Sequence, residues 1–196
     1  MPDEGNRPPR AADLTGGEYV VSQPALGNGH RVEDPDGNLV LKGTQEQLVM
    51  GEETTFDGTD GRPALTVRAG AVLDIAGHYT VIDDRTEEPI VLLDPRFSMV
   101  TERWVLRDPA TEDVIATIEN WSKAVSFLRH LPFVGVAFRI LPHGLEIADA
   151  DGSHVGTIER KFGVKTRYVV RIDDDRTVPH DAVVAATAVI HALAGT

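Results

Sequence analysis

Short apolar runs alternate with turns along most of this chain. Four times, an apolar run leads through a turn that contains aspartate into a second apolar run, a pattern typical of a β-hairpin. These hairpins are predicted at 31–41, 79–92, 104–116 and 145–158. Single strands are predicted at 19–22, 48–50, 64–68 and 167–172. The pattern amounts to about twelve strands, so the expected fold class is mainly β.

Two segments show helical spacing instead. Residues 121–131 carry apolar side chains at helical intervals after Asn120, and Pro132 follows them. This arrangement predicts one short amphipathic helix on the surface. Residues 179–195 predict a second helix, because proline lies in its first turn and glycine just past its end.

The predicted C-terminal helix is apolar on all sides. Between 182 and 194 only Thr187 and His191 are polar, and a helix without a polar face must be surrounded. Its apolar part spans roughly 20 Å, too short for a hydrocarbon core of about 30 Å. An eight-stranded barrel holds little beyond its own side chains. The sequence therefore predicts a closed barrel of about twelve strands that encloses this helix.

Composition narrows the class of protein further. Residues 1–17 are rich in proline and glycine and predict a disordered tail before a single domain at 18–196. The 31 acidic and 19 basic residues give a net charge of -12, which argues against binding to nucleic acid. The chain has no cysteine, no secretory signal and no apolar run long enough to span a membrane. We expect a cytoplasmic protein with no transmembrane segment.

Several short motifs occur in the order found in one known family. They are Leu14-Thr15-Gly16, residues 73–83, Trp104 with Thr117-Ile118, Asp151-Gly152 with Gly156-Thr157-Ile158, and the apolar segment 183–193. With these motifs the chain resembles the LURP-one-related family, which is grouped with the tubby C-terminal domains and the phospholipid scramblases. The resemblance covers nearly everything after the tail.

The resemblance implies a twelve-stranded barrel threaded by the C-terminal helix, in agreement with the size argument. Tubby domains bind phosphoinositides, so the resemblance also implies a binding module for an anionic ligand. Scramblase activity is not expected, because the chain lacks a cysteine-rich segment and a further apolar stretch. Two positions depart from the family pattern, since His191 and His78 stand where acidic residues are more usual.

One short segment is the best candidate ligand site. Arg160, Lys161, Lys165 and Arg167 place four cations within eight residues of an acidic chain. Such a cluster could hold a phosphate-bearing headgroup or another anion. The competing interpretation is a solvated hairpin whose cations pair with nearby acids such as Glu159.

Two other groups of residues suggest metal binding only weakly. Asp173, Asp174 and Asp175 offer oxygen ligands for calcium, but their spacing does not match an EF-hand loop. The seven histidines include no metal-binding motif, and we expect no metal and no cofactor. For His191 we expect a hydrogen bond to a backbone carbonyl or contact with solvent at the barrel rim.

No ordered set of nucleophile, base and oxyanion donor can be named, so we expect a non-enzymatic protein. The first functional hypothesis is therefore a binding module for a phosphorylated or anionic ligand. The alternative is a regulatory or structural protein–protein interaction module with no small-molecule ligand. Its candidate surface is the face of the 121–131 helix that carries Trp121 and Phe127.

Overall fold

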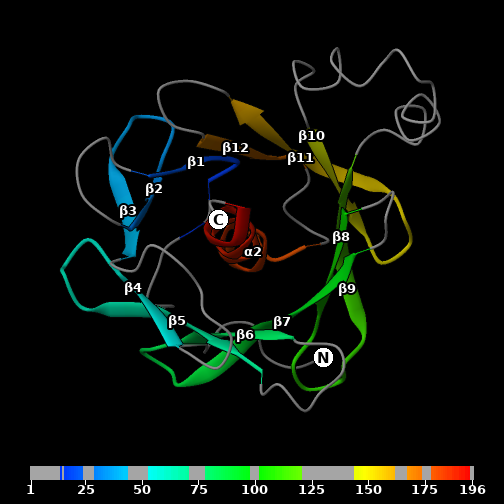
Figure 1. The fold of residues 1–196 in the computed structure, drawn as a ribbon, viewed down its shortest axis with the longest axis horizontal. Coiled ribbons are helices and arrows are strands. Elements are labelled where there is room, and N and C mark those ends of the chain that lie inside the picture. The colour runs from blue at the N-terminus through cyan, green and yellow to red at the C-terminus, as the bar shows by residue number, and fades with distance from the viewer. Residues whose placement is uncertain are drawn as a thin grey trace.

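The protein folds as a closed β-barrel with a helix inside it (Figure 1). This computed structural model describes residues 14, 16–23, 29–43, 53–70, 78–97, 102–120, 144–161, 167–173 and 178–194. The described strands are β1 Glu18–Ser22, β2 His30–Glu33, β3 Leu39–Gly43, β4 Glu53–Asp57, β5 Pro63–Ala69, β6 Tyr79–Asp83, β7 Glu88–Phe97, β8 Glu102–Arg107, β9 Val114–Asn120, β10 Gly144–Asp149, β11 His154–Lys161 and β12 Arg167–Ile172.

The strands form an antiparallel meander that closes on itself. Each described strand pairs with the next one along the chain, and β1 pairs with β12 to close the ring. The closing register runs from Glu18 opposite Arg171 to Ser22 opposite Arg167. The predicted closed barrel of about twelve strands is confirmed.

The C-terminal helix α2, His180–Ala194, lies in the middle of the ring of strands (Figure 1). Every side chain from 182 to 192 is at most 4% exposed. The helix packs against β12, β1, β7 and β2. The predicted enclosure of an all-apolar helix is confirmed, and the barrel supplies the surroundings that such a helix requires.

Side chains alternate between the two faces of the barrel wall, and the inward ones pack around α2. Two inward glycines leave room for close neighbours. A Cβ on Gly43 would lie 2.8 Å from the ring of Phe56, and a Cβ on Gly156 would collide with the carbonyl oxygen of Arg171. These positions therefore accept only glycine without a local shift.

The four predicted hairpins are confirmed, and each turn is organised by its aspartate. Asp34 Oδ1 accepts hydrogen bonds from the backbone N–H groups of residues 36 and 38, and Asp149 Oδ1 accepts them from 151 and 153. Asp83 Oδ1 accepts from 85 and 86, and Asp108 Oδ1 from 110 and 111. The aspartates therefore stabilise turns, as expected for these side chains.

Some sequence predictions differ from the structure or fall outside its described part. Strand β4 was not predicted, because Phe56 is its only large apolar residue. The predicted strand at 48–50 and the predicted amphipathic helix at 121–131 lie outside the described residues. Within the segment predicted as a tail, Leu14 is 4% exposed and Gly17 accepts a hydrogen bond from the Ile172 N–H, so these two residues belong to the barrel.

Candidate functional site

Barrel closure aligns four basic residues on adjacent strands. Lys42 of β3 lies opposite Arg31 of β2, and Arg31 lies opposite Ser22 of β1. On its other side Ser22 lies opposite Arg167 of β12, which in turn lies opposite Lys161 of β11. Residues that lie directly opposite each other share one face of a sheet. We call this set of five residues, Lys42, Arg31, Ser22, Arg167 and Lys161, the basic row.

The basic row lies on the outer surface. Lys42, Arg167 and Lys161 are exposed, and Arg31 and Ser22 are half-buried. Because neighbouring strands lie about 4.8 Å apart, the row spans roughly 19 Å across five strands. On β4, Asp57 lies opposite Lys42 and ends the run of positive charge.

Acidic residues balance only part of this charge. Lys161 Nζ lies 2.9 Å from Glu159 Oε2, and Arg31 Nε lies 3.5 Å from Glu33 Oε1. Hydrogen bonds from Lys161 and Arg171 hold the pKa of Glu159 below its ordinary value. Within the described part of the chain, Lys42 and Arg167 make no ion pair. The row therefore keeps an unbalanced positive charge that can attract an anion.

A second group of polar side chains lies inside the barrel, behind the basic row. Arg160 lies opposite Tyr168, and its guanidinium carbon is 5.9 Å from the centre of the Tyr168 ring. That ring and the ring of His191 on α2 are nearly perpendicular, with their centres 5.2 Å apart. His191 Nδ1 lies 2.9 Å from Nδ1 of His30, which begins β2. These contacts place the basic row at the C-terminal end of α2.

The structure divides the four cations of the predicted ligand site. Lys161 and Arg167 lie side by side in the basic row. Arg160 faces the interior because it lies next to Lys161 along the same strand. Lys165 lies outside the described residues.

Three members of the site, Arg31, Lys42 and Ser22, were not predicted from the sequence. They lie far from residue 160 along the chain, and only the pairing of β1 with β12 brings them into line with Arg167. The signal that was available is the hairpin register, which already sets Arg31 opposite Lys42. Combined with the predicted closure of the barrel, that register would have extended the cluster.

Other sequence expectations have mixed outcomes. His191 is 4% exposed and bonds to His30, so the expected contact with solvent is wrong. Its neighbours on β2 and β12 close over it, which the sequence pattern could not reveal. The Asp173 carboxylate lies 3.3 Å from Nε2 of His154, whereas Asp174 and Asp175 lie outside the described residues. Trp121 and Phe127 also lie outside them.

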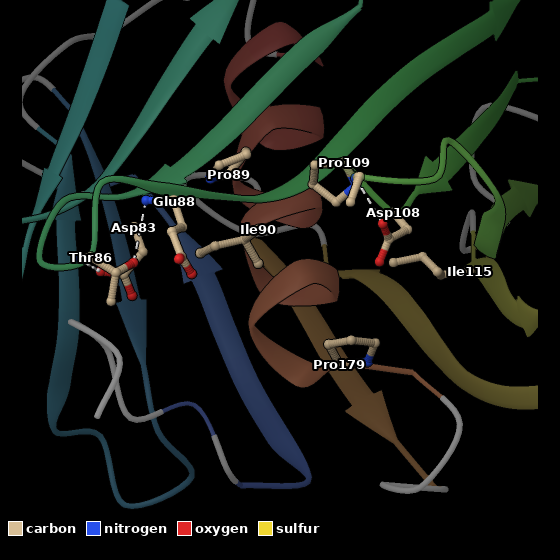
Figure 2. A pocket seen from close by; sticks show the side chains of 10 residues that line it. Asp83, Thr86, Glu88, Pro89, Ile90, Asp108, Pro109, Ile115 and Pro179 are labelled. Carbon is tan, nitrogen blue, oxygen red and sulfur yellow. Dashed lines mark hydrogen bonds between the residues drawn. The ribbon is translucent and has the colours of Figure 1, made fainter. Parts of the chain in front are cut away.

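A pocket of about 500 Å³ lies near the N-terminal end of α2, away from the basic row. Figure 2 shows it between the β6–β7 and β8–β9 turns, with Pro179 at its edge. The carboxylates of Asp83, Glu88 and Asp108 line it, and two of them accept hydrogen bonds from their own turns. Its negative charge makes this pocket unsuitable for an anionic ligand.

Among the residues that the structure describes, no helix is both long enough and apolar enough to cross a membrane. The same residues contain no group of three or more histidine, aspartate or glutamate side chains arranged to hold a metal ion.

Comparison with known proteins identifies the family. A search of curated proteins found no relative of significant similarity. The fold is similar to the crystal structure of a protein from Arabidopsis thaliana, with 12% sequence identity, a TM-score of 0.49 and 89% of each chain covered. The family model described as LURP-one-related matches residues 39–191, which is most of the chain. The chain therefore belongs to the LURP-one-related family.

Proposed function

We propose that this protein is a non-enzymatic, cytoplasmic binding module for a ligand that carries phosphate or similar anionic groups. The observation that supports the proposal is the basic row, in which four cations lie on adjacent strands of a protein with a net charge of -12. A local positive strip on an acidic molecule directs an anion to one place, because the rest of the surface repels it.

The expected affinity of the basic row is modest. A cation near an anionic surface contributes about 1 kcal/mol, so the four cations together contribute about 4 kcal/mol. That free energy corresponds to a dissociation constant on the order of 1 mM for the row alone. Useful binding therefore requires a ligand that contacts several cations at once. A surface with many phosphate groups meets this requirement better than a single free phosphate.

The chemistry of the row favours oxyanions. Arg31 and Arg167 flank Ser22 on the two neighbouring strands, so two guanidinium groups and one hydroxyl group share a short stretch of surface. Guanidinium groups bind phosphate oxygens through paired hydrogen bonds, and a hydroxyl can donate one more. We place the centre of the binding site at these three residues.

The test is sedimentation with lipid vesicles. Vesicles of phosphatidylcholine, with or without phosphatidylglycerol or a phosphoinositide, are compared as binding surfaces. Competition by soluble inositol phosphates or inorganic phosphate separates recognition of a lipid surface from recognition of the free phosphate group. Arg31→Ala combined with Arg167→Ala should weaken binding about thirtyfold, because two contributions of about 1 kcal/mol are lost.

A matched control changes the charge by the same amount elsewhere. Arg68 on β5 and Arg103 on β8 are exposed and face Glu53 and Glu119 at 2.6 and 3.7 Å. Replacing both by alanine should leave vesicle binding nearly unchanged. Equal losses in the two double variants would show that only net charge matters, and the proposed site would then be rejected. Binding to phosphatidylcholine alone at the same level would reject an anionic ligand.

A further inference from the structure

Two buried histidines join the C-terminal end of α2 to the barrel wall. His30 is 1% exposed and His191 is 4% exposed. Their Nδ1 atoms lie 2.9 Å apart and their ring planes meet at 88°. This is a hydrogen bond between a strand and the enclosed helix, made by residues that lie 161 positions apart along the chain.

A bond of this kind depends on the number of protons that the pair holds. One Nδ1 must carry the hydrogen and the other must offer a lone pair. A proton taken up at Nε2 of the donor ring leaves this bond in place. Only when the acceptor Nδ1 is also protonated do two N–H groups face each other, and the bond is then lost. Imidazole is the side chain whose ordinary titration falls between about pH 5 and pH 8. Protonation of both rings in acid would therefore break this contact.

The strands packed against α2 determine what else faces the pair. The Tyr168 ring of β12 lies nearly perpendicular to the His191 ring, and Arg160 of β11 lies over the Tyr168 ring. The inward side chains of β1 and β7 nearest the helix are uncharged, and they include Val21, Val91 and Leu93. Burial and the positive charge of Arg160 oppose protonation of the pair, whereas the helix C-terminus favours it.

The same strand ends carry the histidine pair inside and the basic row outside. His30 precedes Arg31, Tyr168 follows Arg167, and Arg160 precedes Lys161. Neighbouring residues of a strand face opposite sides of the wall, so each inward group lies directly behind a cation of the row. A change of charge or position inside the wall must therefore affect the outer surface.

We propose that the His30–His191 pair is a proton-operated latch that regulates the basic row. With one proton between the rings, the latch holds the end of α2 to β2. Protonation of both rings opens it and adds two positive charges behind the row, which strengthens anion binding. The latch itself is independent of any ligand, whereas its effect on binding rests on the function proposed above.

The latch is tested first without ligand, by hydrogen exchange and NMR of the histidines between about pH 8 and about pH 5. In the wild-type protein, the protection of amides at the start of β2 and in the last turn of α2 should fall as the pH falls. The loss should approach a hundredfold per pH unit where opening is coupled to the uptake of two protons. Amides of Trp104 and Ile118 on β8 and β9 should keep their protection.

The variant His191→Asn is designed to keep the hydrogen bond to His30 while it removes one of the two rings that can take up a proton. An asparagine amide carries a donor and an acceptor close to the position of Nδ1 and does not titrate in this range. It should keep the protection of β2 at neutral pH and lose its pH dependence. His30→Asn makes the same test from the other side if the first variant does not fold. A pH dependence unchanged from wild type in the folded variants would overturn the latch.

The effect on binding is tested with vesicles that contain phosphatidylglycerol, whose charge stays constant over this pH range. Two added charges about 10 Å from the row should tighten wild-type binding roughly tenfold after screening. All other histidines are the same in wild type and in His191→Asn, so the difference between the two proteins isolates the pair. No difference would overturn the regulatory role. Absence of vesicle binding at every pH would overturn the proposed function, and hydrogen exchange would still decide the latch.

Discussion

The substitution Ile190→Ala tests the enclosure of α2 most directly. Ile190 lies on the helix and is 2% exposed. Strands surround the helix, so the structure cannot collapse easily into the space that a smaller side chain would leave. The expected result is a large loss of stability with no change in the surface of the protein.

The magnitude follows from burial and from the rigidity of the surroundings. Replacing a buried isoleucine by alanine costs about 2 to 5 kcal/mol, with the higher values where the cavity stays open. Alanine is the better helix former, which offsets about 0.5 kcal/mol. We expect a net loss of about 3.5 kcal/mol, a considerable part of the roughly 5 to 15 kcal/mol that stabilises a typical domain.

The assay is equilibrium unfolding in urea, supported by the melting temperature. A loss of this size should lower Tm by about 7 to 14 °C for a protein of this length. The matched control is Ile82→Ala on β6, which removes the same atoms from a partly exposed side chain. We expect it to cost about 1 kcal/mol. If the two variants lost equal stability, α2 would not be enclosed as described.

Two further predictions concern the barrel wall. Gly156→Ala should lower the free energy of unfolding by about 1 to 3 kcal/mol in urea titrations, because its Cβ would meet the backbone of Arg171 and Ile172; full stability in this variant would contradict the observed packing of β11 on β12. Burial raises the pKa of Asp84, although Thr66 donates to both of its oxygens. The protonated Asp84 carboxyl group therefore stabilises the folded state at low pH, and this contribution is lost as the pH rises through the raised pKa. Asp84→Asn should remove that loss and raise stability near neutral pH by no more than about 0.5 kcal/mol, whereas a destabilised variant at neutral pH would contradict this sign.

The parts of the fold that depend on local patterns could be predicted from the sequence. The four aspartate turns are local, because each carboxylate bonds to N–H groups two to four residues further along the chain. The enclosure of helix α2 could be predicted because an apolar helix that is too short to cross a membrane must be surrounded by protein. Strand β4 was missed because Phe56 is the only large apolar residue among its five, so the segment shows no alternation of apolar and polar residues.

The candidate site could be predicted only in part, for a different physical reason. Lys161 and Arg167 face each other across one hairpin, and their closeness follows from local spacing. The position of Arg31 depends on the closure of β1 on β12, a contact between distant parts of the chain. The direction of Arg160 depends on strand alternation, which a count of cations in a segment ignores. A cluster of charge in the sequence thus indicates a region, and only the register decides which side chains share a face.

The same closure explains why the histidine pair and the basic row occur together. Closing the barrel pairs β1 with β12, and these two strands and β2 pack against α2. The inward positions at this junction must pack against the helix, which places Tyr168 and His30 against His191. The outward positions remain open to water and are free to carry Arg31 and Arg167. A ligand that binds the row therefore contacts the strands that close the barrel, so binding should also stabilise the protein, by an amount that grows with ligand concentration.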